Sequence, residues 1–178
     1  VLAAAPVALL TLRPLALAVA ELHFRAGRYP ACRAVCAGSL TTGDDADVLL
    51  WLAFAATWQG DRAAAAQTLQ RLDSALSATA ADQPQRQWSS YLHALGAYYA
   101  GELGQAGDRL AALAQSARGA LLAAVLSGQG LVAHRRGDLA QARVRYAQAE
   151  ALAQAIGDHP RALNMAMMVT TTSSSISV

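Results

Sequence analysis

Long runs of small and apolar residues, rich in Ala and Leu, alternate along the chain with short breaks that contain glycine. Each of Gly27, Gly60, Gly101 and Gly137 follows one helix-compatible run and precedes another. Ala and Leu lose little conformational freedom in a helix, and runs of β-branched residues are scarce before the C-terminal tail. The pattern therefore predicts a series of consecutive α-helices.

The four breaks share a short phrase in which glycine precedes the start of the next helix. This phrase occurs at Gly60-Asp61, Gly101-Glu102 and Gly137-Asp138, with a looser copy at Gly27-Arg28. Glycine ends a helix because it tolerates a left-handed backbone, and an acidic residue favours the N-terminus of the next helix through the helix dipole. We therefore expect a tight turn at each break, with two antiparallel helices around it.

The repeated phrase resembles the tetratricopeptide-repeat family, whose units are about 34 residues long. In the fourth unit Gly130 stands where the first helix needs a small residue, and Tyr146 is the large apolar plug between the small contacts Ala142 and Ala149. Small residues allow close helix approach, and large ones fill the gaps that remain. The corresponding residues of the second and third units are Leu49, Leu52, Ala53, Ala65 and Leu69, and Ala94, Ala106 and Leu110.

The resemblance implies an all-α fold, an α-solenoid of antiparallel helical hairpins wound as a right-handed superhelix. We expect one repeat domain over residues 1–169, with about four hairpins and a final single helix at Pro160–Met168. Residues 170–178 are rich in Ser and Thr, and they are expected to form a disordered tail or to mark where a longer parent protein was cut.

The first unit departs most from the family, because Cys32 and Cys36 replace the small and large residues of its second helix. Residues four apart share one face of a helix. A disulfide between them would strain the required geometry, and two thiolates alone make an incomplete zinc site. We therefore expect both cysteines to be small, buried core residues.

In the family that the repeats resemble, the first helix of each hairpin lines a concave surface. With the register set by the glycine turns, the residues on this surface are Phe24, Arg25, Phe54, Trp58, Trp88, Tyr91, Leu95, Tyr98, Tyr99, His134 and Arg135. They include seven of the ten aromatic residues, and the same register assigns Tyr29, Trp51 and Tyr146 to packing. Aromatic side chains supply a large contact area at low entropic cost. The sequence thus predicts a groove for an extended peptide, a partner helix or a sugar-like ligand, unless the rings fill the inside of a short superhelix or pack under a neighbouring domain.

The sequence favours a binding scaffold over an enzyme, with neither a cofactor nor a metal site. The four histidines fall on different repeats at no metal-ligand spacing. There is no phosphate-binding glycine-rich loop, no His-Glu-x-x-His and no nucleophile elbow. The net charge of +2 gives no reason to expect direct binding of nucleic acid, and the arginines at 135, 136, 143 and 145 are interpreted as a solvated surface.

The first twenty residues are apolar apart from Thr11 and Arg13. No charged region precedes this run, and Arg13-Pro14 divides it into two short halves. We therefore expect a buried helix, no membrane contact and a cytoplasmic protein, and the alternative is an export signal in residues 1–20.

Our leading hypothesis is a module that binds a protein or peptide partner in the aromatic groove. The alternative is a regulatory domain that senses a small-molecule inducer or an inhibitory protein within a larger bacterial transcription or signalling protein. It depends on residues 153–158, Ala-Gln-Ala-Ile-Gly-Asp, which resemble the repeat regions of large bacterial transcriptional activators. A third hypothesis is a homo-oligomer that forms through uncapped repeat ends, since terminal repeats normally need a polar cap.

Overall fold

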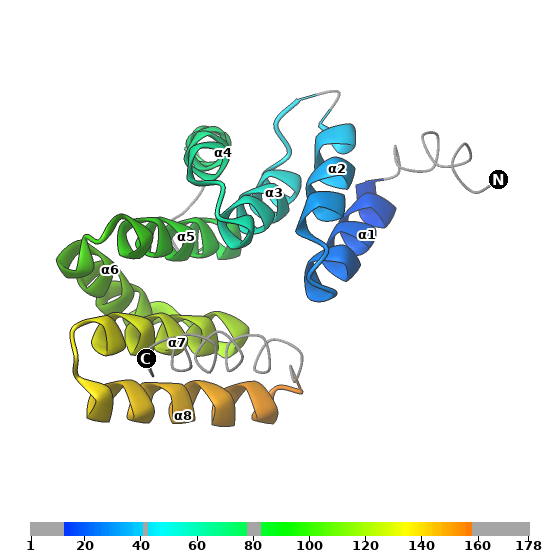
Figure 1. Ribbon diagram of the computed structural model, residues 1–178. Coiled ribbons are helices and arrows are strands. Elements are labelled where there is room, and N and C mark those ends of the chain that lie inside the picture. The colour runs from blue at the N-terminus through cyan, green and yellow to red at the C-terminus, as the bar shows by residue number, and fades with distance from the viewer. Residues whose placement is uncertain (1–12, 41–42, 78–82, 158–178) are drawn as a thin grey trace, which may run out of the picture. The chain divides into compact units, whose positions relative to one another are not determined.

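The computed structural model describes residues 13–40, 43–77 and 83–157, and these residues form eight α-helices without a strand (Figure 1). The helices are α1 (Arg13–Arg25), α2 (Tyr29–Ser39), α3 (Ala46–Gln59), α4 (Arg62–Ala75), α5 (Pro84–Ala100), α6 (Leu103–Ser116), α7 (Gly119–Arg135) and α8 (Leu139–Ala155). The all-α class predicted from the sequence is confirmed for this part of the chain. The expected helix Pro160–Met168, the tail at 170–178 and the apolar run up to residue 12 lie outside the described residues.

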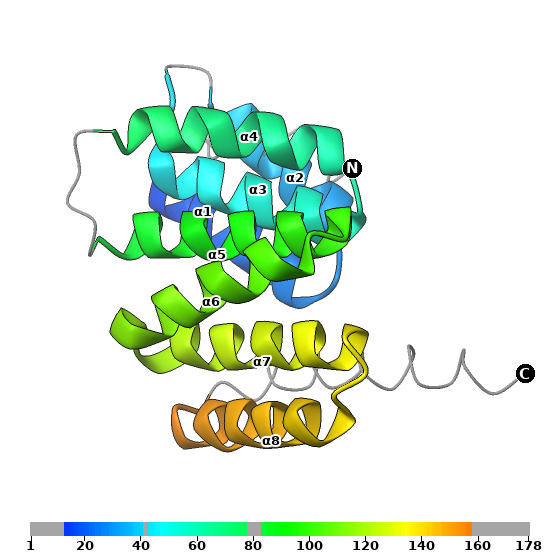
Figure 2. The same ribbon diagram turned by 90° about the vertical axis from the view of Figure 1, so that its left-hand side faces the viewer.

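The chain divides into two compact units, residues 1–96 and 97–178, and the boundary falls inside α5. In the first unit α1 packs on α2, α2 on α3 and α3 on α4, while α1 also contacts α3. In the second unit α6 packs on α7, and α7 lies beside α8 (Figure 2). None of the helices in the described ranges combines the length and the apolarity needed to cross a bilayer.

All four predicted glycine turns have the same backbone geometry. The φ angles of Gly27, Gly60, Gly101 and Gly137 are 70°, 78°, 88° and 84°, in the left-handed region that glycine adopts without a steric penalty. The amide of the residue after each glycine bonds a carbonyl five residues earlier, as in Asp61 N to Ala56 O at 3.0 Å. This is the Schellman arrangement, which satisfies the last carbonyls of one helix and turns the chain toward the next. The predicted turns are confirmed.

Two groups of apolar side chains fill the core of the first unit. One group joins α3, α4 and α5 through Leu49, Ala53, Leu69, Leu72, Leu76 and Leu92. The other joins α1, α2 and α3 through Ala20, Cys32, Cys36, Val48 and Ala55. Both cysteines are free thiols in this core, which confirms their predicted burial. A hydrogen bond with Cys32 and burial together raise the pKa of the Cys36 thiol far above its usual value.

The second unit contains an example of the predicted alternation of small and large residues. A Cβ atom placed on Gly130 of α7 would lie 2.6 Å from Cε1 of Tyr146, which comes from α8. Ala142 and Ala149 of α8 are buried on either side of this tyrosine along the helix. The absence of a side chain at Gly130 therefore lets α8 approach α7 closely, as the family resemblance implied.

Candidate functional site

Seven aromatic side chains of the first unit form one continuous set of ring contacts, which we call the aromatic cluster. Its members are Phe24, Tyr29, Trp51, Phe54, Trp58, Trp88 and Tyr91. The centroids of neighbouring rings lie 5.3 to 5.9 Å apart, in tilted or edge-to-face arrangements. Phe24 and Phe54 each contact four other rings and so form the centre of the cluster.

Helix geometry brings these rings together from four helices. Trp51, Phe54 and Trp58 follow one another on α3 at intervals of three and four residues, so they share one face of that helix. Phe24 lies near the end of α1, and the Gly27 turn places Tyr29 of α2 at a ring distance of 5.4 Å from it. The contribution of α5 comes from its first half, which belongs to the same unit.

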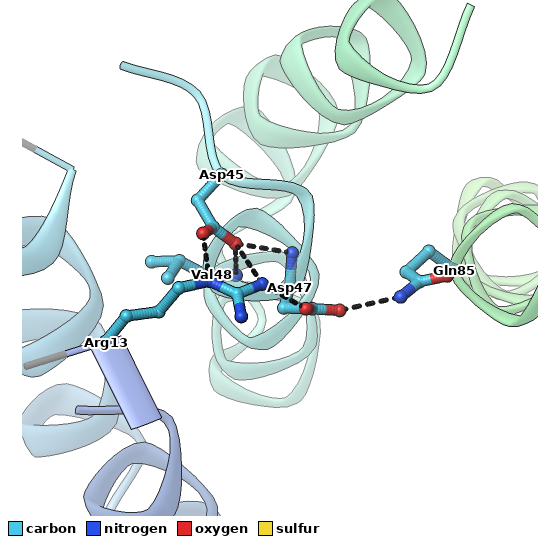
Figure 3. Close-up of polar contacts among 5 residues, drawn as sticks. All are labelled: Arg13, Asp45, Asp47, Val48 and Gln85. Atoms are coloured by element: carbon cyan, nitrogen blue, oxygen red, sulfur yellow. Dashed lines mark hydrogen bonds and ion pairs between the residues drawn. The ribbon is translucent and has the colours of Figure 1, made fainter. Parts of the chain in front are cut away.

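The start of α3, the helix that carries three of the rings, is held by a polar network (Figure 3). The Asp45 carboxylate accepts hydrogen bonds from the backbone amides of Asp47 and Val48 at 3.0 and 3.3 Å. Arg13 reaches from α1 to the carboxylates of Asp45 and Asp47, and Gln85 of α5 donates to Asp47 at 2.8 Å. The Arg13 hydrogen bond holds the pKa of Asp45 below its usual value. The network thus ties α1 and α5 to the N-terminus of α3.

Burial separates the predicted groove residues of the first unit. Phe24, Phe54, Trp58 and Trp88 are partly buried, so each of these residues keeps some exposed surface. Tyr91 is only 3 % exposed, and Leu95, one helical turn later, is buried on the same face of α5. The prediction that these two side chains line an accessible surface is therefore wrong, because this face of α5 is directed into packing. Arg25 is exposed and is ion-paired with Glu21 of its own helix at 2.7 Å.

The structure also adds two residues to the aromatic cluster that the sequence register had assigned to packing. Trp51 and Tyr29 are both partly buried and both contact Phe24. For Trp51, the signal was present in the sequence, because it precedes Phe54 by three residues and must share its helix face. For Tyr29, only the folded turn brings the ring back to α1.

The remaining predicted residues, Tyr98, Tyr99, His134 and Arg135, lie in the second unit. The Tyr98 and Tyr99 rings meet edge to face at 5.3 Å, and the Arg135 guanidinium lies over the Tyr98 ring at the same centroid distance. Arg135 also donates to the Tyr98 carbonyl at 3.4 Å, whereas His134 is partly buried on α7. Burial, with a smaller effect of Tyr98, raises the pKa of Tyr146 to about 12. A single groove built from both units stays a prediction.

No protein-family model matches the chain, and no curated protein matches its sequence. The interpretation of the candidate site therefore depends on its geometry.

One cluster of Ser, Asp and His side chains has the components of a nucleophilic site but not their order. Asp73 of α4 accepts a hydrogen bond from the Ser89 hydroxyl at 2.7 Å, and its other oxygen lies 2.7 Å from Nε2 of His93. Nucleophilic catalysis needs the histidine between the serine and the carboxylate, so that the imidazole takes the hydroxyl proton. Here the carboxylate is in the middle, and Ser89 is 2 % exposed. The arrangement joins α4 to α5, and sequence reasoning missed it because its members lie on different helices.

Proposed function

We propose that the chain is a protein-interaction module whose aromatic cluster binds a peptide or a helix of a partner protein. The observation that carries this proposal is the continuity of the cluster, in which seven rings are in contact and six of them are only partly buried. Partly exposed aromatic groups are enriched at binding hot spots, where they bury a large area and, for Trp and Tyr, also offer a hydrogen bond.

The packing of the rings supports a surface that is ordered before a partner arrives. Phe24 and Phe54 each contact four rings, so their rotamers are restricted by neighbours from other helices. Binding to such a surface loses less side-chain entropy than binding to mobile side chains, for which the cost is about 0.5–1.5 kcal/mol per immobilised side chain.

The proposal includes membership of the tetratricopeptide type and, with it, a right-handed solenoid. Its support is the backbone geometry shared by the four glycine turns and the fit of Tyr146 against Gly130. Four turns with one geometry are what a chain of equivalent hairpins requires, since each hairpin repeats the same helix exit and helix entry.

Tryptophan fluorescence gives a direct test, because all three tryptophans of the chain belong to the aromatic cluster. Peptides selected on the purified chain from a displayed random library would be titrated while emission and acrylamide quenching are recorded. We expect the selected peptides to shift the emission and to shield the tryptophans from acrylamide. A response to small apolar ligands but to none of the selected peptides would contradict the proposal.

Substitution of Trp58 separates binding from folding. Trp58→Ala removes a ring at the edge of the cluster, and Trp58→Phe is the matched control that keeps a ring. We expect the alanine variant to bind a selected peptide about tenfold more weakly, with a smaller loss for the phenylalanine variant. Thermal unfolding followed by circular dichroism checks both variants. If the alanine variant lost stability but kept its affinity, the ring would belong to the core and not to a binding surface.

A further inference from the structure

A groove with a volume of about 390 Å³ opens between α2 and α4 in the first unit. Ala34 and Ala37 of α2 line one side, Ala64 of α4 lines the other, and Leu52 and Ala56 of α3 lie between them. Small side chains on both helices leave this space open, since an alanine extends only one carbon from the backbone. These residues form the apolar part of the lining, and Arg33, Gln67, Thr68 and Arg71 form its polar part.

The groove and the aromatic cluster use opposite faces of α3. Successive residues of an α-helix are rotated by about 100°, so Leu52 and Ala56 point roughly 120–160° away from Phe54 and Trp58 and roughly 100–140° away from Trp51. The two surfaces are thus separate features of the same unit, and a ligand in the groove does not depend on the function proposed for the cluster.

Two arginines line the groove, and each is ion-paired with an aspartate beside it. Among the residues that line it, Arg33 and Arg71 are charged and none is acidic. Arg33 is paired at 2.9 Å with Asp61, the N-cap of α4, whereas Arg71 lies later on α4 and is paired at 2.5 Å with Asp44. An α-helix rises 1.5 Å per residue, so the stretch from Asp61 to Arg71 is about 15 Å long. The two guanidinium groups therefore lie toward opposite ends of the groove.

Both guanidinium groups keep donors for a further anion. The hydrogen bonds of Arg33 to Gln59 and Asp61 both use Nη1, so Nε and Nη2 have no partner in the described part of the chain. The hydrogen bonds of Arg71 to Asp44 use Nε and Nη2, so Nη1 has no partner among the described residues. The side-chain amide of Gln67, which lines the groove between them, also makes no hydrogen bond to the described residues. A carboxylate at each end can thus join the existing ion pairs, and Gln67 can bond a peptide main chain.

We propose that this groove binds an extended, acidic peptide segment of a partner protein, with one carboxylate on Arg33 and another on Arg71. The groove has a volume of about 390 Å³. A helix of about 10 Å diameter and about 15 Å length occupies roughly 1,200 Å³, so a helix does not fit into the groove. An extended chain advances about 3.3 Å per residue, so acidic residues four or five positions apart match the two arginines. Small apolar residues between them lie over Leu52 and the alanines.

Fluorescence anisotropy with a labelled peptide tests this assignment. The probe is acetylated and amidated Glu-Ala-Leu-Ala-Glu carrying fluorescein, and its neutral match is Gln-Ala-Leu-Ala-Gln. We expect the acidic peptide to bind at low ionic strength, at least tenfold more tightly than the neutral one, and to weaken as salt screens the charges. No binding of the acidic peptide up to 1 mM, or equal binding of both peptides, would overturn the proposal.

Charge variants identify the site on the protein. Arg33→Gln and Arg71→Gln should each weaken binding of the acidic peptide about tenfold, because each removes a charge-assisted hydrogen bond. Arg109→Gln is the matched control, since Arg109 is an exposed arginine of α6 and does not line the groove. An equal loss of affinity in all three variants would mean that the peptide responds only to the net charge of the chain and does not bind at the groove.

Filling the groove tests its shape without changing its charge. Ala37→Leu puts a larger side chain into the groove at an exposed position of α2, whereas Ala66→Leu makes the same change on α4 outside it. We expect only Ala37→Leu to abolish binding, with melting curves that stay close to that of the unsubstituted chain. Binding by Ala37→Leu as tight as that of the unsubstituted chain would overturn the proposal. Free suberate that competes as tightly as the peptide would instead indicate a site for a small dicarboxylate.

Discussion

Gly130 of α7 and Tyr146 of α8 are in close contact in the second unit. Gly130 lies in the middle of α7, where glycine would normally weaken a helix by roughly 0.5–1 kcal/mol relative to alanine. Its presence is explained by the Tyr146 ring, which occupies the space where a Cβ would lie. At this position close packing of two helices outweighs the intrinsic preference of one of them.

Substitution of Gly130 should therefore destabilise the fold despite the gain in helix propensity. We expect Gly130→Ala to lower the free energy of unfolding, and Gly130→Leu to lower it further, by roughly 1–3 kcal/mol, through overpacking against Tyr146. The measurement is chemical unfolding followed by circular dichroism. Gly96→Ala is the matched control, because a Cβ on this exposed helical glycine meets nothing within 4 Å, and it should stabilise by roughly 0.5–1 kcal/mol.

A double-mutant cycle isolates the contact itself. In a Tyr146→Ala background the ring is absent, so Gly130→Ala should become neutral or stabilising. If Gly130→Ala cost the same free energy with and without the ring, another neighbour would be responsible for the small residue at this position.

At the scale of elements, the hairpins share their helix exits but differ in their helix entries. Asp61 and Asp138 cap α4 and α8 by accepting hydrogen bonds from the amides of Ala64 and Gln141 at 3.0 and 2.9 Å. Glu102 has the same place before α6, but its side chain makes no capping hydrogen bond. Aspartate is among the best N-cap residues, whereas the longer glutamate side chain does not fit the same short bond to the backbone.

The difference between these caps can be measured in one pair of variants. We expect Asp138→Ala to lower the free energy of unfolding by about 1 kcal/mol, the usual value of an N-cap, and Glu102→Ala to have a much smaller effect. Both residues follow a positive-φ glycine and precede a helix, so the pair differs mainly in the hydrogen bond. Equal losses in the two variants would indicate that charge near the helix dipole, and not the hydrogen bond, decides the stability of these helix starts.

At the scale of the whole molecule, the tryptophans and cysteines that can serve as spectroscopic and chemical probes belong to one of the two units. All three tryptophans and both cysteines lie in the first unit. The cysteines are buried between α2 and its neighbours, whereas the tryptophans join α1, α3 and α5 through the aromatic cluster. The two kinds of probe thus report on adjoining parts of one packed body.

We expect the first unit to unfold as one cooperative body, because its two core clusters meet on α3. In a denaturant series, the reactivity of the two thiols with a disulfide reagent should rise at the same concentration at which tryptophan emission changes. The buried thiols should react slowly before that point, because both are shielded from the reagent in the core and the thiolate of Cys36, the reactive form, is also disfavoured there. Thiols that react well before the emission changes would show that α2 opens independently of α3.

Several features of the fold follow from the sequence alone because they depend on neighbouring residues. Ala- and Leu-rich runs form helices, and a glycine between two such runs takes the left-handed conformation that ends the first of them. The spacing of Trp51, Phe54 and Trp58 also assigns them to one helix face without any knowledge of the fold. Local chemistry thus predicts the helices, their turns and part of the candidate site.

Only the tertiary structure decided which faces meet and how deeply each is buried. The fold buries the Tyr91 side chain and places the Tyr29 ring against the ring of Phe24. It also places the Asp73 carboxylate between the side chains of Ser89 and His93. It also left a groove between α2 and α4, which are not consecutive in the chain. These features depend on contacts between residues that are distant in sequence, and helical periodicity assigns a residue to a face without saying what covers that face. The sequence therefore determined the local course of the chain, and packing decided its surfaces.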